Sequence, residues 1–188
     1  LPANAAKKAE EVEHGTFKGY RFVETKIDQG VRKHWFVKDD SVTGTEKVEE
    51  KRTGWQYIAD KWYFFDQDGV KKTGWLSDGS WYYLAADGSM QTGWMFISGK
   101  WYYLNSAGSM QTGWLNQSGK WYYLHSDGAM ATGWRKIDGV WYYLNTSGAL
   151  VTGWFQAGGK WYYAYSSGAL AVNTTINGYT LNANGEWV

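Results

Sequence analysis

A unit of about 20 residues recurs six times between Thr53 and Leu170, and this repeat constrains the fold more than any other feature. Each copy contains Thr-Gly-Trp, a short polar segment, Trp-Tyr-Tyr-Leu or a close variant, a Gly-containing turn and usually a Met or Leu. The copies place twelve tryptophans, at positions 55, 62, 75, 81, 94, 101, 114, 121, 134, 141, 154 and 161. A period of this length indicates an array in which each unit buries its apolar face against its neighbours.

Each copy has the pattern of a β-hairpin. In the third copy, residues 93–97 and 100–104 are rich in aromatic and aliphatic side chains and flank Ser98-Gly99, a typical hairpin turn. The second copy has five residues between its tryptophans where the others have six, so its turn must be tighter. Because an isolated hairpin is barely stable in water, consecutive hairpins must stack. The predicted fold class is all-β, a solenoid of stacked β-hairpins.

The flanking segments predict a division into residues 1–52, the six repeats at 53–170 and a C-terminal capping half-repeat at 171–188. Residues 3–13 are rich in helix formers but too short to hold a helix alone, and we interpret them as a solvated leader or linker. Two alternating runs, 17–25 and 31–38, predict a further hairpin. Trp35-Phe36-Val37 and residues 42–44 resemble parts of a degenerate repeat, and the charged stretch 45–52 predicts an exposed loop.

Composition excludes several functional classes. The 188 residues carry a net charge of +1, which argues against a nucleic-acid-binding surface, and no cysteine is present for a disulfide or thiolate site. No apolar run is long enough to insert into a membrane. The start at Leu1 resembles a processed N-terminus, so no targeting signal can be read.

Catalytic and metal-binding signals are also missing from the sequence. The three histidines, His14, His34 and His125, are scattered along the chain, and the Asp-Gly pairs are explained by turn chemistry better than by a calcium site. We therefore expect no enzymatic activity, no metal site and no cofactor.

Strand alternation separates the aromatic residues of a repeat onto two faces. Trp101 and Tyr103 share one face of their strand, and Tyr102 takes the other. We interpret the first tyrosine of each copy as core, namely Tyr63, Tyr82, Tyr102, Tyr122, Tyr142 and Tyr162.

The two tryptophans of one copy and the second tyrosine of the next would then form an aromatic cage, with Met at its base. Such a cage suits a quaternary ammonium ion, which offers no hydrogen-bond donor but is attracted by ring faces. Aromatic packing alone is the competing explanation of the same rings.

The units TGWLNQSGKWYYLHSDGAM at 112–130 and TGWRKIDGVWYYLNTSGAL at 132–150 resemble the choline-binding repeats of surface proteins from pneumococci and their phages. The resemblance extends from Thr53 to Val188. It implies a left-handed hairpin solenoid that binds choline or phosphocholine of teichoic and lipoteichoic acids. The protein would be secreted and attached non-covalently to the bacterial cell wall. A homodimer is an open option.

In that family two tryptophans, a tyrosine of the following repeat and often a Met form each site. Carried onto this sequence, the first cage is Trp55, Trp62 and Tyr83, with Val70 at the Met position; the second is Trp75, Trp81, Tyr103 and Met90; the third is Trp94, Trp101, Tyr123 and Met110; the fourth is Trp114, Trp121, Tyr143 and Met130; and the fifth is Trp134, Trp141, Tyr163 and Leu150. A sixth cage, at Trp154, Trp161 and Leu170, lacks its closing tyrosine because Thr180 stands in that place.

Two alternatives remain. Related aromatic repeats bind glucans or other glycans by stacking on sugars, and a glycan-binding module is therefore a second hypothesis. The third is a wall-anchored enzyme whose activity lies in residues 1–52.

Overall fold

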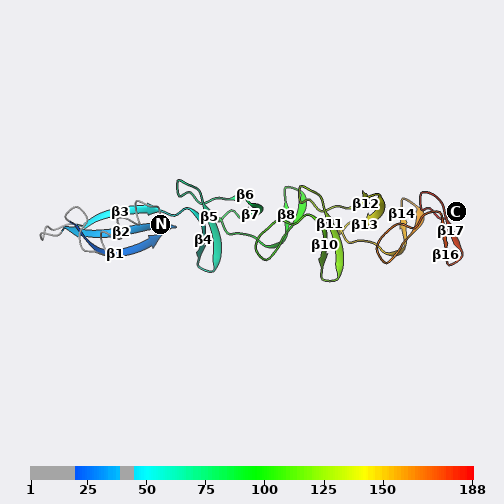
Figure 1. Cartoon of the computed structure of the whole chain (residues 1–188), viewed down its shortest axis with the longest axis horizontal. Helices are drawn as coiled ribbons and strands as arrows, with labels where there is room; N and C mark the ends of the chain where they lie inside the picture. Colours follow the sequence, from blue (N-terminus) through cyan, green and yellow to red (C-terminus); the bar gives the residue numbers. More distant parts are fainter. Residues whose placement is uncertain (1–19, 39–44) are drawn as a thin grey trace. The chain divides into compact units, whose positions relative to one another are not determined.

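The computed structural model describes residues 20–38 and 45–188, and every regular element within them is a β-strand (Figure 1). The predicted fold class is confirmed, because the repeats form stacked hairpins. The predicted leader at residues 3–13 and the echo of a repeat at residues 42–44 lie outside the described residues. One compact unit extends to Asp78 and includes Tyr83–Met90, and the other contains Gly79–Tyr82 and Gln91–Val188. The predicted boundaries after residues 52 and 170 stay predictions.

The segment before the repeats forms a three-stranded antiparallel sheet in the order β1-β2-β3. Its strands are β1 (Tyr20–Asp28), β2 (Val31–Lys38) and β3 (Thr45–Lys51). The hairpin predicted from the two alternating runs is therefore present as β1 and β2. The loop predicted for Thr45–Arg52 is wrong, because Thr45–Lys51 pairs with β2 from Val37 to Val31. Charged residues suit an edge strand, whose outer backbone side is unpaired, so their presence does not indicate a loop.

Each repeat forms one hydrogen-bonded pair of five-residue strands. The pairs are β4 (Gly54–Ile58) with β5 (Lys61–Phe65), β6 (Gly74–Asp78) with β7 (Ser80–Leu84), β8 (Gly93–Ile97) with β9 (Lys100–Leu104), β10 (Gly113–Gln117) with β11 (Lys120–Leu124), β12 (Gly133–Ile137) with β13 (Val140–Leu144), and β14 (Gly153–Ala157) with β15 (Lys160–Ala164). A shorter pair, β16 (Thr174–Ile176) with β17 (Tyr179–Leu181), ends the chain. Gly79 alone separates β6 from β7, in agreement with the tighter turn expected there.

The two-residue hairpin turns place both of their residues in the left-handed region of the backbone. Ser98 and Gly99 adopt φ values of 51° and 81°, as a two-residue turn of this hand requires. In the first repeat the same two places are taken by Ala59 at 49° and Asp60 at 64°. Side chains with a Cβ adopt this conformation at a cost, so the first turn is strained relative to the others.

Asp60→Gly is therefore expected to raise the free energy of unfolding by about 0.5–1 kcal/mol, because glycine adopts positive φ without steric cost. The reverse change at an equivalent turn, Gly99→Asp, should lower it, since nothing lies within 4 Å of an added Cβ there and only backbone strain is introduced. Urea denaturation of the two variants measures both effects. Changes of the same sign in the free energy of unfolding of the two variants would contradict this explanation.

Backbone hydrogen bonds fix the stacking of successive repeats. After strand β11 the chain turns back, so that Met130 pairs with Leu124 and its N–H donates to the Trp101 carbonyl of the preceding repeat at 2.8 Å. The same bond joins Met110 to Trp81, Leu150 to Trp121, Leu170 to Trp141 and Trp187 to Trp161, and in the other unit Met90 to Trp62. The position of each hairpin is therefore set by main-chain contacts as well as by ring packing.

The most deeply buried large side chains are leucines at the ends of the second strands. The largest fully buried side chains are Leu84, Leu104, Leu124, Leu144 and Leu181. The prediction that the first tyrosines form the core is wrong, because they are only half-buried in all six hairpins. The buried residue that ends each second strand, a leucine except for Phe65 in β5 and Ala164 in β15, lies on the same face as the first tyrosine and is bridged to the connection that follows.

Candidate functional site

Each of the six repeat hairpins has a face that carries its two tryptophans and an opposite face that carries its first tyrosine, which we call the tryptophan face and the tyrosine face. In the pair β10–β11, Trp114 is the register partner of Tyr123, and Asn116 is the partner of Trp121. Leu115 and Tyr122 are partners one position further along and therefore point to the opposite side. The alternation of the strands thus puts both tryptophans of a repeat on one face and its first tyrosine on the other.

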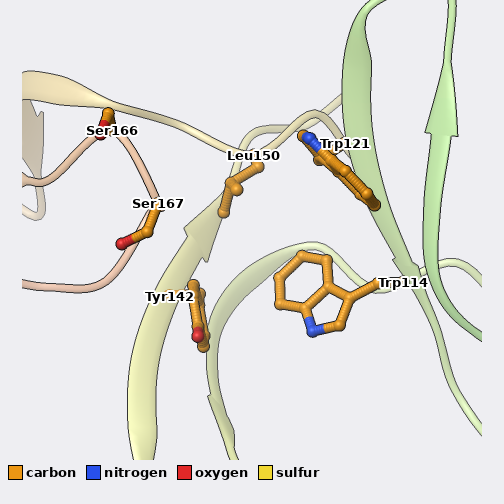
Figure 2. Close-up of a pocket in the computed structure, with 6 residues that line it drawn as sticks. All are labelled: Trp114, Trp121, Tyr142, Leu150, Ser166 and Ser167. Carbon is orange, nitrogen blue, oxygen red and sulfur yellow. The ribbon is translucent and has the colours of Figure 1, made fainter.

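The fourth cage forms where the tryptophan face of β10–β11 meets the tyrosine face of β12–β13. A cavity of about 360 Å³ is lined by Trp114, Trp121, Tyr142, Leu150, Ser166 and Ser167. In Figure 2 the three rings surround a gap, with Leu150 at its edge. The Trp114 and Tyr142 centroids are 4.9 Å apart and the rings meet edge to face at 69°. The two serines come from the exit turn of the sixth repeat, so three consecutive repeats contribute to one cage.

The third cage repeats this arrangement one unit earlier. Trp94, Trp101, Tyr122, Met130 and Ser147 line a cavity of about 260 Å³. Trp94 and Tyr122 lie 4.9 Å apart at 63°, nearly the same geometry as the equivalent pair in the fourth cage. The thioether of Met130 replaces the Leu150 side chain.

Two further junctions follow toward the C-terminus. In the fifth, the Trp134 and Tyr162 rings are 4.8 Å apart, and Trp141 lies 6.4 Å from Trp134. An additional ring, Phe155, stacks on Tyr162 at an interplanar angle of 23°. In the last junction Trp154, Trp161, Tyr179 and Trp187 line a cavity of about 290 Å³, which we call the terminal cage.

Comparison with known proteins gives these repeats a family. The sequence model of the family described as "Choline-binding repeat" matches residues 52–92, 91–132 and 131–174. The chain belongs to the choline-binding repeat family. A search of curated proteins gives no significant match.

Several solved structures resemble the chain. Choline binding protein F from Streptococcus pneumoniae is 43% identical with a TM-score of 0.72, over 84% of this chain and 61% of that one. CbpJ from Streptococcus pneumoniae TIGR4 is 48% identical with a TM-score of 0.72, over 88% of this chain and 58% of that one. The modular autolysin LytC from the same species is 25% identical with a TM-score of 0.54, over 88% of this chain and 42% of that one. The chain therefore spans about 60% of the length of protein F and CbpJ.

The second tyrosines that the sequence-based assignment places in the third and fourth cages, Tyr123 and Tyr143, do not line those cavities, whose tyrosines are Tyr122 and Tyr142 instead. The second tyrosine of each repeat from the second to the sixth packs edge to face against the first tryptophan of its own hairpin: Tyr83 on Trp75, Tyr103 on Trp94, Tyr123 on Trp114, Tyr143 on Trp134 and Tyr163 on Trp154. The register explains this, because the two residues of each described pair are direct cross-strand partners on one face. Successive hairpins stack head to tail, so the ring across the gap comes from the opposite face, which carries the first tyrosine.

The Met position also belongs to a different cage from the one predicted. Met130 lines the third cage and Leu150 the fourth, whereas the sequence had placed them in the fourth and fifth. Met110 and Met90 bond by their N–H groups to Trp81 and Trp62, each one repeat earlier than expected. The cause is that the chain turns back after the second strand of each repeat, so that the residue at the Met position lies against the preceding hairpin.

In the first repeat, Trp55 and Trp62 lie on the tryptophan face of β4–β5. Trp55 Nε1 donates a hydrogen bond at 2.9 Å to Oδ2 of Asp78, at the end of β6 in the second repeat. Tyr83 packs on Trp75 at a centroid distance of 5.2 Å, and the first predicted cage, with Tyr83 as its closing ring, stays a prediction. The second predicted cage combines residues of both compact units and stays a prediction.

In the first repeat, the ammonium group of a lysine lies over the ring of the first tyrosine. Lys71 is paired with Phe65 as Met130 is with Leu124, so Lys71 and not Val70 takes the Met position. The Nζ atom of Lys71 lies 5.1 Å from the centroid of Tyr63, the first tyrosine of that repeat. A ring at this position can therefore hold a cation within the folded chain.

Carboxylates in the exit turns serve the backbone. Asp87 accepts hydrogen bonds from the N–H and hydroxyl of Ser89, and this hydroxyl is the main cause that holds the pKa of Asp87 below its usual value. Asp127 likewise accepts from the Ala129 N–H at 2.9 Å. Within residues 20–38 and 45–188 no group of three or more His, Asp or Glu could hold a metal ion. No helix long and apolar enough to cross a membrane is found in the same residues.

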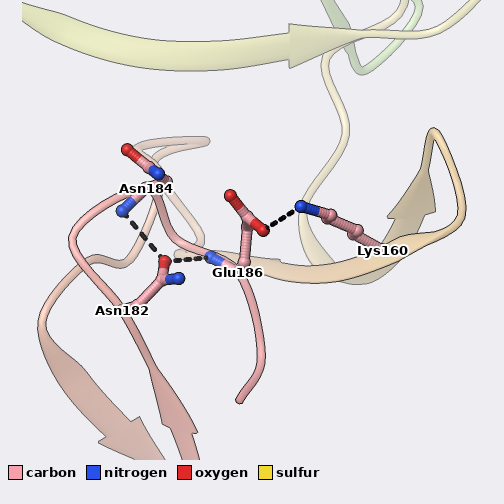
Figure 3. Close-up of polar contacts among 4 residues, drawn as sticks. All are labelled: Lys160, Asn182, Asn184 and Glu186. Atoms are coloured by element: carbon pink, nitrogen blue, oxygen red, sulfur yellow. Dashed lines mark hydrogen bonds and ion pairs between the residues drawn. The ribbon is translucent and has the colours of Figure 1, made fainter.

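An ion pair joins the last hairpin to the sixth repeat. Lys160 Nζ donates to Glu186 Oε2 (Figure 3). The hydrogen bond from Lys160 holds the pKa of Glu186 below its usual value of 4.5, and Glu186 in turn raises the pKa of Lys160. Because the Glu186 pKa is lower in the folded chain, its contribution to stability is present above pH 4.5 and is lost as the pH falls through the folded value.

We therefore expect the stability difference between the wild type and Glu186→Gln to shrink as the pH is lowered from neutral to below 4.5. Denaturation curves at a series of pH values measure it, with Asp138→Asn as a control in an exposed hairpin turn. A difference that grows on acidification would contradict the assigned role of the pair.

Proposed function

We propose that the chain attaches to bacterial cell-wall polymers by binding their choline groups in the cages between successive hairpins. The observation that carries the proposal is the fourth cage, in which Trp114, Trp121 and Tyr142 present ring faces and edges around one open cavity. Membership in the choline-binding repeat family supports the choice of ligand.

The chemistry of the cage favours a quaternary ammonium over other cations. Its methyl groups contact ring carbons without losing hydrogen bonds, and the ring faces attract the positive charge. Each such contact stabilises binding by about 0.5–2 kcal/mol, so three rings give roughly millimolar affinity. The Lys71 ammonium over Tyr63 supports the capacity of these rings for cations. The structure of protein F in complex with ipratropium, in a chain 44% identical, is consistent with this chemistry, because that compound carries a quaternary nitrogen.

A weak single site becomes effective when it is repeated. Teichoic and lipoteichoic acids that carry phosphocholine at regular intervals would engage several cages of one chain, and linked binding events raise the overall affinity by about 10²–10⁴. The location that follows is the bacterial surface, where the chain would be held non-covalently. The third, fourth and terminal cages supply at least three cavities for this purpose.

We assign the repeats a binding role and no catalytic one. The linings of these three cavities contain aromatic, aliphatic and serine side chains and no carboxylate or histidine that could transfer a proton. LytC is named as an autolysin, so a longer protein that contains such an array can be a hydrolase. A digestion assay on choline-bearing cell walls tests the assignment, and release of soluble fragments by this chain would contradict it.

Isothermal titration with choline tests the proposed ligand. We expect saturable heat in the millimolar range with choline and none with ammonium chloride at equal ionic strength. Retention on a resin with choline-like amine groups, and elution by free choline, should accompany it. Absence of both heat and retention would overturn the proposal. Retention on dextran that choline does not reverse would favour the glycan-binding alternative instead.

A further inference from the structure

The C-terminal end carries a cage that the repeat pattern does not predict. Its closing ring is Tyr179, which is the register partner of Ile176 just as Tyr122 is the partner of Leu115. Thr180, which stands at the second-tyrosine position, is not needed for closure, because the third and fourth cavities are lined by first tyrosines and not by second ones. Tyr179 and Trp187 also lie beyond residue 174, where the family match ends.

A tryptophan replaces Met at the base of this cage. Trp187 is bridged to Leu181 as Met130 is bridged to Leu124, and its N–H donates to the Trp161 carbonyl at 2.9 Å. The Tyr179 ring lies 5.5 Å from Trp154 and 5.6 Å from Trp187, edge to face in both cases. The cavity is therefore lined by four aromatic residues, whereas the third and fourth cages are lined by three and an aliphatic or thioether chain.

The residue before Trp187 is fixed by two sets of contacts. The Glu186 N–H donates to Asn182 Oδ1 at 2.9 Å, and its carboxylate accepts from the Lys160 ammonium (Figure 3). The equivalent positions in the six repeats hold an alanine, a serine or, in the first repeat, Val70, so this carboxylate is particular to the last hairpin. Its side chain is only 18% exposed, although that of Lys160 is 59% exposed. These contacts hold the backbone that positions Trp187 over the cavity.

We propose that the terminal cage is a further binding site for a quaternary ammonium ion, with Trp187 as a binding residue and the Lys160–Glu186 pair as its positioning device. The inference rests on the proposed function of the other cages. Because a fourth ring adds one more contact to the cation, the terminal cage binds choline more tightly than the three-ring cages, by roughly 2- to 30-fold.

Fluorine NMR of the full chain labelled with fluorotryptophan separates the sites. Trp187→Phe, Trp161→Phe and Trp121→Phe variants assign the three resonances, and choline chloride is the titrant, with ammonium chloride as the ionic control. We expect the Trp161 and Trp187 signals to shift at lower choline concentrations than the Trp121 signal. A Trp187 signal that stays in place while Trp121 shifts would overturn this inference alone. If no tryptophan signal shifts, the proposed function fails as well.

Variants then separate binding from positioning. Trp187→Ala is expected to lower the affinity reported by Trp161 at least threefold while leaving that reported by Trp121 unchanged, and Trp187→Phe should retain most of the affinity. Glu186→Lys should weaken the terminal cage alone, and the charge-swapped pair Lys160→Glu with Glu186→Lys should restore it. Equal loss in the single and the swapped variants would contradict the positioning role.

Discussion

Tyr142→Ala is expected to lower the affinity of the fourth cage for choline by roughly 2- to 30-fold, because it removes one ring of three. Tyr143→Ala, one residue away, should leave the affinity at this cage nearly unchanged, since Tyr143 packs on Trp134 in its own hairpin. The Trp121 fluorine signal reports the fourth cage specifically and is the appropriate measurement for both variants.

The two tyrosines form a matched pair, because both are half-buried and adjacent in β13. Loss of affinity only in Tyr143→Ala would support the cage composition predicted from the sequence and contradict the one found in the structure. The thermal stability of both variants should be recorded as well, because Tyr143 stacks on Phe155 and its loss is expected to destabilise the fifth junction.

Gly148→Ala is expected to disturb the third cage through Met130. Gly148 has a φ of +82°, and an added Cβ would lie 2.4 Å from Met130 Sδ and 2.8 Å from its Cε. The backbone strain alone should cost about 1–2 kcal/mol of stability. In addition, Met130 must move away, and because it lines the third cage its displacement should weaken choline binding there by about threefold or more.

The control is Gly139→Ala, which has nearly the same φ of +81° but no atom within 4 Å of the added Cβ. Both variants should lose stability in urea denaturation to a similar extent. Only Gly148→Ala should change the choline response of the Trp101 fluorine signal. An equal change in the two variants would show that backbone strain, and not contact with Met130, controls the cage.

The repeat period and the x-Gly pairs were sufficient to predict stacked hairpins and their turns, because both features act within about 20 residues. Strand alternation also separated Tyr122 from Trp121 and Tyr123 correctly. What alternation cannot specify is which face of one hairpin meets which face of the next. That depends on bonds such as Met130 N–H to the Trp101 carbonyl, which join residues of different repeats and leave no local pattern.

The same limitation explains the error at the C-terminus. Alignment of the repeats puts Thr180 at the second-tyrosine position and therefore predicts an incomplete last junction. The structure closes it with Tyr179 and with Trp187 at the Met position, two residues that a single-repeat alignment does not single out. In a head-to-tail stack the tryptophan face of the last hairpin would otherwise be open, and the short hairpin β16–β17 covers it with rings of its own.

The central claim is that head-to-tail stacking creates cages that bind quaternary ammonium ions. A crystal structure determined at saturating choline tests it most directly. We predict that a trimethylammonium group lies between Trp114, Trp121 and Tyr142 in the fourth cage. Empty cages at saturating choline, or a cation on the side of Tyr143, would contradict the claim.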